Sequence, residues 1–220
     1  ETQATLADGE FVEVPMPAAD GYALDADRVI DAMGPDTAAV VLTTPSNPTG
    51  RVFDPDESRA VVAAAADHDA YVIADEVYLG LTYDGDPTGI AALTGHPDHV
   101  LTVGSCSKTY AMTGWRLGWL AGDSHLVDEV VKTHESTTAC ASTIAQHAAI
   151  AALTGPQEPV AEMYDAFESR RDLVVDRIAD IDGLTAPRPE GAFYAFLDPG
   201  VEDDLALAKF LLREHRSEEH

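Results

Sequence analysis

Three short apolar runs alternate with helical patterns in the first half of the chain. The runs cover residues 38–43, 71–74 and 100–103, and polar residues follow each of them. After the first run, Asp54 and Pro55 open a helical pattern with a capping carboxylate and a proline at the first helical position. This alternation predicts right-handed βαβ units and a mainly parallel sheet. The continuous run 38–43 is typical of a strand that is covered on both faces.

The remaining patterns extend this plan toward both ends of the chain. Residues 10–15 and 191–196 alternate in a way that predicts a short strand in each segment, and residues 115–121 predict another. Helices are expected over residues 25–33, 54–68, 123–132, 144–153, 158–181 and 205–213.

The composition is ordinary for a soluble globular protein, with 45% hydrophobic residues in 220. No apolar run approaches the roughly eighteen residues of a membrane span, and the N-terminus has neither the basic region nor the apolar core of a signal peptide. We therefore expect an intracellular, cytoplasmic protein. Cys106 and Cys140 are its two cysteines, and they offer neither a disulfide framework nor the spacing of metal ligands.

The charge is extreme, because 39 acidic residues face 13 basic ones and the formal net charge is −26. Nucleic acids and anionic membranes would be repelled by such a surface, so neither is expected as a partner. The acidic residues are spread along the whole chain, while lysine is nearly absent. This distribution resembles that of proteins from salt-in halophiles, in which high salt screens the self-repulsion.

Lys108 is one of three lysines, and it follows directly after the apolar run 100–103 and a short segment of small residues. A lysine amine held in such a pocket near other cations can lose its proton and form a Schiff base with an aldehyde. Ser105, Ser107 and Arg116 would provide a site for a dianion, since hydroxyls and guanidinium groups suit phosphate. An aldehyde that carries a phosphate is pyridoxal 5′-phosphate.

The segment Ser105-x-Ser107-Lys108-x-x-x-Met112-x-Gly114-x-Arg116-x-Gly118 closely resembles the cofactor-lysine signature of class I/II aminotransferases, which are pyridoxal-phosphate enzymes of fold type I. The resemblance implies that Lys108 is the Schiff-base lysine and that Ser105 and Arg116 bind the cofactor phosphate. Taken singly, such residues are usually solvated charges or ion-pair partners, and only their spacing favours this function. A nucleotide-binding phosphate loop would need a glycine directly before the lysine, where this chain has Ser107.

Two further segments agree with the resemblance in their order along the chain. Asn47 lies in a turn, Pro45 to Gly50, that resembles the family's Asn-Pro-x-Gly element, although an Asn-Pro turn alone is more often structural. Asp75 ends an apolar run, where ligands of an open α/β sheet bind. The resemblance implies that Asp75 pairs with the pyridine nitrogen, and that Asn47 and Tyr78 donate to the phenolic oxygen. Glu76 is interpreted as a surface or helix-start acid.

The resemblance spans essentially the whole chain and implies a three-layer, doubly wound α/β fold. Residues 1–156 would form the large cofactor-binding domain, and residues 157–220 would form an interdomain helix and part of a smaller α+β domain. The glycine-rich phosphate loop and stacking aromatic of the family's first third are missing, as is its carboxylate-binding arginine. The chain is therefore expected to be a fragment of a homodimeric protein.

The leading interpretation of function is an aminotransferase that moves an amino group between an amino acid and a 2-oxo acid. The lysine segment looks most similar to those of aspartate- and aromatic-type transaminases. A lyase of the same fold would use the same parts, and a non-catalytic aminotransferase-like domain is the alternative from another class. The appearance of the cofactor's amine form with amino acid and 2-oxo acid would distinguish these cases.

Overall fold

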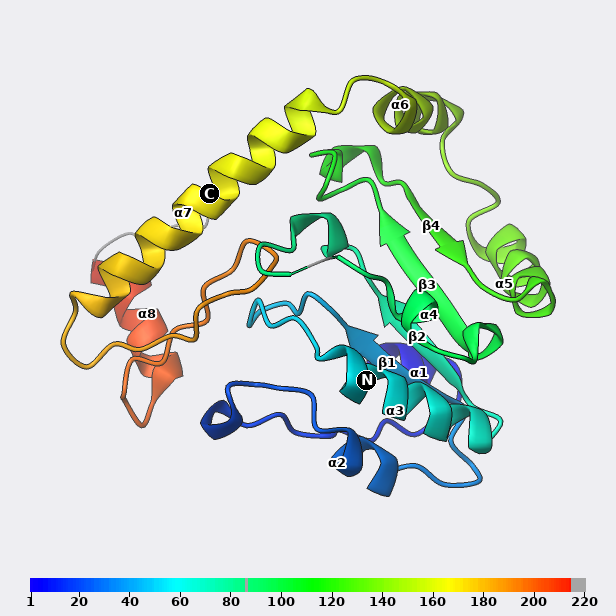
Figure 1. Cartoon of the computed structure of the whole chain (residues 1–220), viewed down its shortest axis with the longest axis horizontal. Coiled ribbons are helices and arrows are strands. Elements are labelled where there is room, and N and C mark those ends of the chain that lie inside the picture. The colour runs from blue at the N-terminus through cyan, green and yellow to red at the C-terminus, as the bar shows by residue number, and fades with distance from the viewer. Residues whose placement is uncertain (86, 215–220) are drawn as a thin grey trace.

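The computed structural model describes residues 1–85 and 87–214, and within them a four-stranded sheet forms the centre of the molecule (Figure 1). The strands lie in the order β1 (Ala39–Thr43), β2 (Tyr71–Asp75), β3 (Val100–Ser105) and β4 (Gly118–Ala121). The first three are parallel and β4 is antiparallel to β3. Thr43, Asp75 and Val103 share one level, so the carboxyl ends of β1, β2 and β3 meet at one edge.

One face of the sheet is covered by α2 (Ala26–Asp31), α3 (Pro55–Asp67) and α4 (Ile90–Leu93). Asp54 caps α3, because its carboxylate accepts the backbone N–H groups of the second and third helical residues. The main core consists of buried strand side chains packed against these helices: Leu42, Val72, Ala74, Val100, Val61, Val62, Ala65, Val29 and Ile90. Burial of each larger aliphatic side chain stabilises the fold by about 1.5–3 kcal/mol.

The opposite face of β1 is open within the described residues. Val41 points to this side and is 62% exposed, whereas its neighbour Leu42 is 2% exposed. The expectation that residues 38–43 are covered on both faces is therefore wrong. Among the described residues, the helices that pack against β1 lie on the face that carries Val40 and Leu42.

Two predicted strands are absent from the structure. Residues 10–15 form no ladder, and Val14 packs its side chain against the core in an irregular segment after α1 (Thr2–Leu6). Residues 191–196 make a single bridge, between Gly191 and Thr82. Ala192 has a φ of 58°, which is incompatible with an extended strand at that position.

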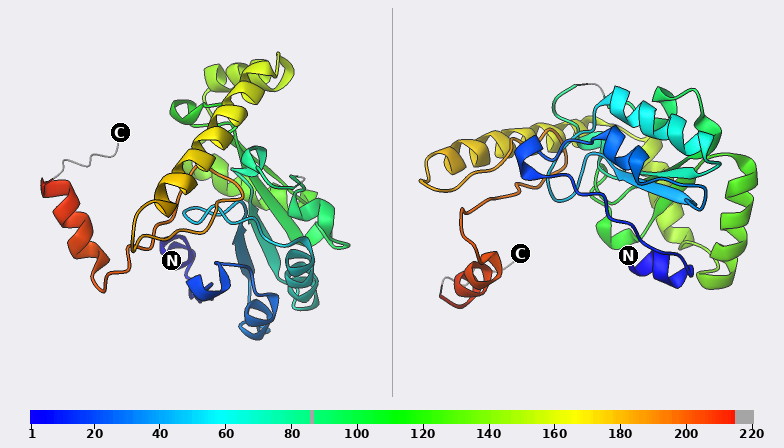
Figure 2. Two further views of the ribbon diagram at one scale, coloured as in Figure 1. Left: turned by 60° about the vertical axis from the view of Figure 1, so that its left-hand side comes forward. Right: turned by 90° about the horizontal axis from the view of Figure 1, so that it is seen from below.

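The second half of the chain is helical, in close agreement with the sequence pattern. Its helices are α5 (Ser124–Thr137), α6 (Thr143–Thr154), α7 (Glu158–Ala179) and α8 (Asp204–Glu214). Short 3₁₀ turns occur in the first half at η1 (Ala18–Asp20), η2 (Leu79–Leu81) and η3 (Pro97–His99), and in the second half at η4 (Thr113–Trp115). α7 runs along one side of the molecule, and α8 stands apart from the sheet in both views of Figure 2. In the described part of the chain, no helix has the length and apolarity needed to cross a bilayer.

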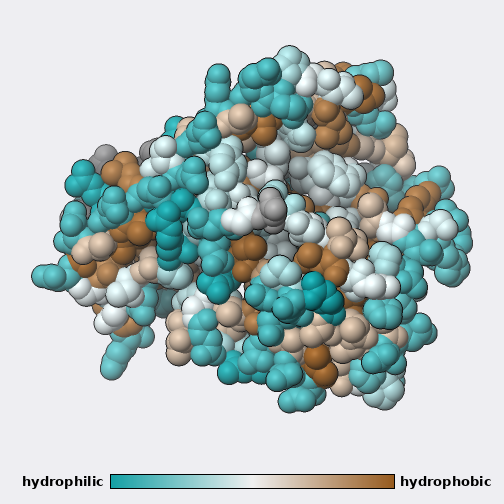
Figure 3. Space-filling view, in the orientation of Figure 1, coloured by the Kyte–Doolittle hydropathy of each residue, from teal (hydrophilic) through white to brown (hydrophobic). Residues whose placement is uncertain are grey.

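The helix α5 continues five residues beyond the predicted end at Lys132. Its last turns carry hydroxyl side chains that hydrogen-bond to backbone carbonyls four residues earlier, as Ser136 does to Lys132 and Thr137 does to Thr133. The face shown in Figure 3 is mostly hydrophilic, with apolar patches between the polar side chains.

Candidate active site

The loop between β3 and β4 presents Lys108 beyond the carboxyl edge of the sheet. Its two ends are joined by a hydrogen bond of 3.2 Å from the Cys106 N–H to the Leu117 carbonyl, and Met112 N–H donates to the Cys106 carbonyl at 3.2 Å. Cys106 is 1% exposed. The buried anchor fixes the backbone from which the lysine side chain extends.

The Lys108 ammonium lies against two aromatic rings. Its Nζ is 5.3 Å from the ring centroid of Tyr78 and 5.2 Å from that of Phe193, within the range of cation–π attraction. Among residues 1–85 and 87–214, no carboxylate forms an ion pair with Lys108, whereas Lys132 is paired with Glu129 on α5. The charge of Lys108 is therefore left open to a ligand.

Three polar side chains meet beside this lysine. The hydroxyl oxygens of Tyr78 and Tyr194 are 2.6 Å apart, and Asn47 Nδ2 donates to the Tyr194 hydroxyl at 3.3 Å. Tyr78 is 3% exposed. Burial, with the hydrogen bond to Tyr78, raises the pKa of Tyr194 to about 12, although the positive charge of Lys108 opposes this shift. Tyr194 therefore keeps its proton at neutral pH.

The predicted phosphate ligands lie at the end of β3, where Ser105 is the last residue, and in the loop that carries Lys108. The Ser105 hydroxyl accepts the Ser107 N–H at 3.0 Å and donates to the Leu117 carbonyl at 3.4 Å, which places it beside the residue that follows Arg116. Arg116 is exposed and has a φ of 52°, and its guanidinium donates to the Thr113 carbonyl at 3.0 Å. The guanidinium is thus held at the surface by its own turn.

Two neighbouring acids at the end of β2 have different environments. Asp75 is half-buried, and its carboxylate accepts the Val77 N–H at 3.4 Å. Glu76 is 8% exposed, and its Oε1 accepts the Ile90 N–H at 2.6 Å, which caps α4. Burial raises the pKa of Glu76, while the hydrogen bond from Ile90 lowers it. Of the two interpretations of Glu76, a surface acid is wrong, because the residue is buried. It does serve the start of a helix, but that helix, α4, begins 14 residues later.

Comparisons with known proteins agree on one family. The family model of aminotransferase class I and II matches residues 1–216. The chain belongs to the class I and II aminotransferase family.

Two curated relatives of this family have similar sequence identity to this chain and similar coverage. The aspartate aminotransferase of Geobacillus stearothermophilus is 35% identical over 208 residues, 94% of this chain and 52% of that protein. The aspartate/prephenate aminotransferase of Thermus thermophilus is 36% identical over 212 residues, 94% of this chain and 54% of the relative. The chain therefore spans about half the length of these curated relatives.

Two solved structures have the same fold as this chain. The aspartate aminotransferase from Thermus thermophilus with maleate has a TM-score of 0.88 at 36% identity, over 94% of this chain and 55% of that one. The aromatic aminotransferase from Pyrococcus horikoshii has a TM-score of 0.87 at 34% identity, over 94% of this chain and 57% of that one. The predicted family and α/β fold are confirmed.

Class I and II aminotransferases use pyridoxal phosphate, and the residues around Lys108 fit this cofactor. The side chains of Asn47 and Tyr78 both hydrogen-bond to the phenolic oxygen of Tyr194. Pyridoxal phosphate carries a phenolic oxygen of the same kind, so the same two side chains are suited to it. The lysine amine has no ion-pair partner in the described residues. The donor set of the site therefore matches an aldehyde that also bears a phenol.

Phe193 and Tyr194 also lie at this site, although they are not among the site residues that the sequence predicts. The signal was an aromatic pair after the turn Pro189-Glu190-Gly191. The backbone places this pair, because Ala192 N–H donates to the Leu81 carbonyl at 2.9 Å and the Tyr83 hydroxyl donates to the Ala192 carbonyl.

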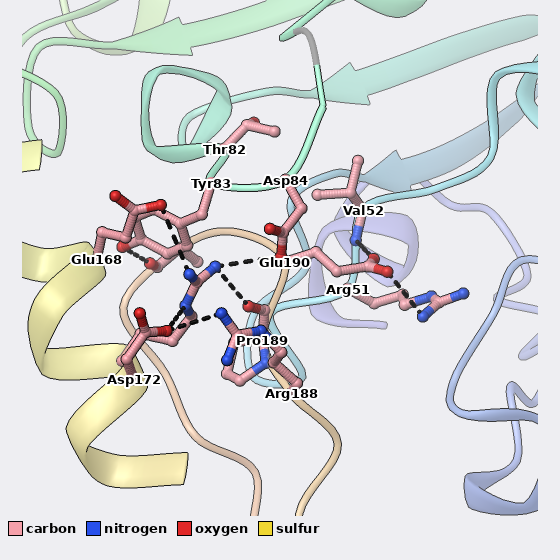
Figure 4. A network of polar contacts seen from close by, with 12 residues as sticks. Arg51, Val52, Thr82, Tyr83, Asp84, Glu168, Asp172, Arg188, Pro189 and Glu190 are labelled. Atoms are coloured by element: carbon pink, nitrogen blue, oxygen red, sulfur yellow. Dashed lines mark hydrogen bonds and ion pairs between the residues drawn. The ribbon is translucent and has the colours of Figure 1, made fainter. Parts of the chain in front are cut away.

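Arg171, a buried arginine of α7, holds the same segment through contacts with Asp84 and Pro189, both of which are labelled in Figure 4. The Arg171 side chain is 5% exposed, and it forms ion pairs with three carboxylates, Asp84 at 3.2 Å, Glu168 at 3.5 Å and Asp172 at 2.9 Å. It also donates to the Pro189 carbonyl at 3.5 Å. The residue network thus joins α7, the loop after η2 and the segment that carries Phe193 and Tyr194.

Glu190 ties this segment to the turn that carries Asn47. Its carboxylate pairs with Arg51 at 3.0 Å and accepts the Val52 N–H at 2.9 Å (Figure 4). Gly191 is required here, because a Cβ at this position would lie 2.6 Å from the Pro45 ring. The turn 45–50 and the segment 189–194 are therefore packed directly against each other.

Proposed function

We propose that the protein containing this chain is a pyridoxal-phosphate-dependent aminotransferase that moves an amino group between an amino acid and a 2-oxo acid. The observation that carries this proposal is the unpaired Lys108 amine between the rings of Tyr78 and Phe193, beside the donors that converge from Asn47 and Tyr78. Bound pyridoxal phosphate supplies an electron sink for a carbanion at the substrate's Cα.

The chain's own residues have distinct proposed roles. Lys108 Nζ holds the cofactor by its aldehyde, and as a free amine it moves a proton at the substrate's Cα. The Asp75 carboxylate keeps the pyridine nitrogen protonated, and the Tyr78 hydroxyl and Asn47 amide orient the phenolic oxygen. Ser105, Ser107 and Arg116 bind the phosphate, for which hydroxyls and a guanidinium are suited.

Borohydride reduction followed by peptide mapping tests the role of Lys108. Reduction of the natural protein that carries this sequence, after loading with pyridoxal phosphate, should attach the cofactor to Lys108. Attachment to Lys132 or Lys209 would contradict the proposal.

The relatives favour aspartate or an aromatic amino acid as the amino donor, with 2-oxoglutarate as a suitable acceptor for the assay. The second candidate is a lyase of the same fold, since the same lysine and acid would serve it. A transaminase should convert the bound cofactor to its amine form with the amino acid and restore it with the 2-oxo acid. A lyase would release its product without this cycle, and a non-catalytic domain would give neither change.

The assembly proposed for this aminotransferase is a cytoplasmic homodimer. Residues 1–156 would form the large domain, and residues 157–220 would supply the interdomain helix and part of the small domain. The position of α7 along one side of the molecule supports this division (Figure 1).

We also propose that the acidic surface is adapted to high salt. A net charge of −26 on 220 residues repels itself, and added salt reduces the Debye length from about 10 Å at 0.1 M to about 3 Å at 1 M. The melting temperature should therefore rise by several degrees between these two salt concentrations. An unchanged melting temperature would contradict a halophilic origin of the charge.

A further inference from the structure

The Tyr194 hydroxyl lies in the middle of a hydrogen-bonded chain with a defined direction. The amide nitrogen Nδ2 of Asn47 can only donate hydrogen bonds, so the Tyr194 oxygen accepts this bond at 3.3 Å. The Tyr194 proton is then free to be donated to the Tyr78 oxygen, 2.6 Å away. In this arrangement, the proton of Tyr78 is the one that remains available beside Lys108.

We propose that Tyr194 is a positioning residue that orients the Tyr78 hydroxyl as a hydrogen-bond donor into the Lys108 site. This inference rests on the proposed function, in which Tyr78 donates to the phenolic oxygen of the cofactor. Hydrogen bonds in a chain polarise one another, so a hydroxyl that accepts from Tyr194 becomes a stronger donor.

The surroundings of Tyr194 suit a residue that must hold one orientation. Its ring is 5.6 Å from that of Tyr78 at 76°, and 4.9 Å from that of Phe193 at 49°. Its backbone follows Ala192, which is fully buried and bonded to Leu81. The raised pKa of Tyr194, caused first by burial, keeps its hydroxyl able to donate.

The direction of these hydrogen bonds, from Asn47 through Tyr194 to Tyr78, has a consequence for the cofactor. A donor that points at a phenolic oxygen stabilises the anionic form of that oxygen, so its loss makes the oxygen harder to deprotonate. Removal of the Tyr194 hydroxyl should therefore weaken the bond that Tyr78 donates, although Tyr194 itself need not touch the cofactor.

A double-mutant cycle in the natural protein tests this coupling, with Tyr194→Phe, Tyr78→Phe and the double variant. Tyr194→Phe should increase the dissociation constant of pyridoxal phosphate about twofold, less than the loss of a whole hydrogen bond would, because the bond from Tyr78 is weakened and not removed. It should also raise the pH midpoint at which the visible absorbance of the bound cofactor changes. Tyr78→Phe should give larger changes in the same directions, and the double variant should match Tyr78→Phe alone.

Tyr71→Phe is the matched control for this cycle. Tyr71 is at the other end of β2, where its ring stacks on His99, so loss of its hydroxyl should leave both cofactor readouts unchanged. If Tyr194→Phe does not fold, incorporation of 3-fluorotyrosine at residue 194 provides a second test. Its more acidic hydroxyl is a stronger donor, so the pH midpoint should move downward.

Three results would overturn the proposal. Additive effects of the two substitutions would show that Tyr194 does not act through Tyr78, and unchanged readouts in Tyr194→Phe would show that its hydroxyl has no role. Tighter cofactor binding in Tyr194→Phe would mean that Tyr194 competes with the cofactor instead of supporting its donor.

The cofactor-free protein separates this inference from the proposed function. The melting temperatures of the four proteins without cofactor should be non-additive if the hydroxyls of Tyr78 and Tyr194 are bonded. Additive melting temperatures would overturn the inference whatever the protein catalyses. Failure of borohydride to label Lys108, together with non-additive melting temperatures, would instead overturn the proposed function.

Discussion

Two cations of this chain lie over tyrosine rings, yet their electrostatic surroundings are opposite. The Arg171 guanidinium carbon is 4.8 Å from the ring centroid of Tyr83, and three carboxylates also pair with this arginine. Lys108 Nζ is 5.3 Å from the ring centroid of Tyr78, with no ion-pair partner in the described residues. Both cations therefore lie against a tyrosine ring, but carboxylates neutralise the charge of Arg171 and none pairs with Lys108 in the described residues.

This difference indicates what each cation does. Arg171 is neutralised by residues of α7 and of the loop that follows η2, so its charge fixes the relative positions of these segments. Lys108 is positioned by its loop and by aromatic packing, and its charge remains for a ligand. Arg171 holds the segment 189–194, which carries Phe193 and Tyr194. Lys108 faces the ring of Phe193 in that segment.

The strongest test of the comparison is the substitution Lys108→Ala. Turnover should fall by more than about a thousandfold, because in the proposed function both the covalent attachment and the proton transfer at Cα depend on this amine. The melting temperature of the cofactor-free protein should change little, since no ion pair of the described structure is lost. Lys132→Ala, on the surface of α5, is the control and should keep both properties. Retained turnover in Lys108→Ala would show that its open charge has another purpose.

Asp75→Asn should reduce turnover about a hundredfold while the protein still binds the cofactor. In the proposed function the Asp75 carboxylate keeps the pyridine nitrogen protonated, and an amide could not supply that negative charge, so the electron sink would become weaker. Steady-state kinetics and cofactor absorbance would measure the two effects separately. Asp36→Asn, in the exposed turn before β1, is the matched control. Activity within about threefold of the parent would mean that Asp75 is structural.

Arg171→Met should lower the free energy of unfolding by about 2–3 kcal/mol. The substitution leaves Asp84, Glu168 and Asp172 without their shared cation, although their exposed fractions of 51%, 39% and 49% allow water to solvate them partly. Urea unfolding of the cofactor-free protein would measure the change. Arg188→Met is the control within the same network: its side chain is 49% exposed and its single pair with Asp172 should contribute under about 1 kcal/mol. Equal losses in the two variants would contradict the assigned importance of burial.

Glu76 should produce a smaller, pH-dependent effect on stability. Burial raises its pKa in the folded state above the usual value of 4.5, so the folded protein retains a proton that the unfolded chain releases. Stability should therefore fall as the pH rises from about 4.5 through the folded pKa, by at most about 1.4 kcal/mol per pH unit. Urea unfolding of the parent and Glu76→Gln across this range would measure it. The parent should gain stability relative to the variant at the acidic end, and parallel curves would show that Glu76 does not titrate in this way.

Much of the fold followed from local patterns in the sequence. The caps at Asp25, Asp54 and Asp123 mark the starts of three helices, and each carboxylate accepts a backbone N–H in the structure. The strand preceding Lys108 and the long helix α7 were predicted nearly to their ends. These features depend on residues within a few positions of one another, so the sequence contains their signal directly.

The assignments at 10–15 and 191–196 were wrong because alternation alone does not supply a strand partner. A strand forms when another strand pairs with it, and in the described residues the first of these segments makes no ladder, while the second makes one bridge. The exposure of Val41 has a related cause. An apolar run indicates that burial is favourable, but the neighbouring elements decide which faces are covered.

The family, the parallel βαβ plan and the lysine segment with its small neighbours follow from local patterns of residues. Only the tertiary structure placed Tyr194 against Tyr78, Arg171 against Asp84 and the Glu76 carboxylate at the start of α4. The two members of these pairs are separated by 116, 87 and 14 positions, respectively. A side chain's local pattern states that it is polar or aromatic, whereas its partner is chosen by the way distant segments pack, and this is why the contacts of Tyr194 with Tyr78 and Asn47 emerge only in the folded chain.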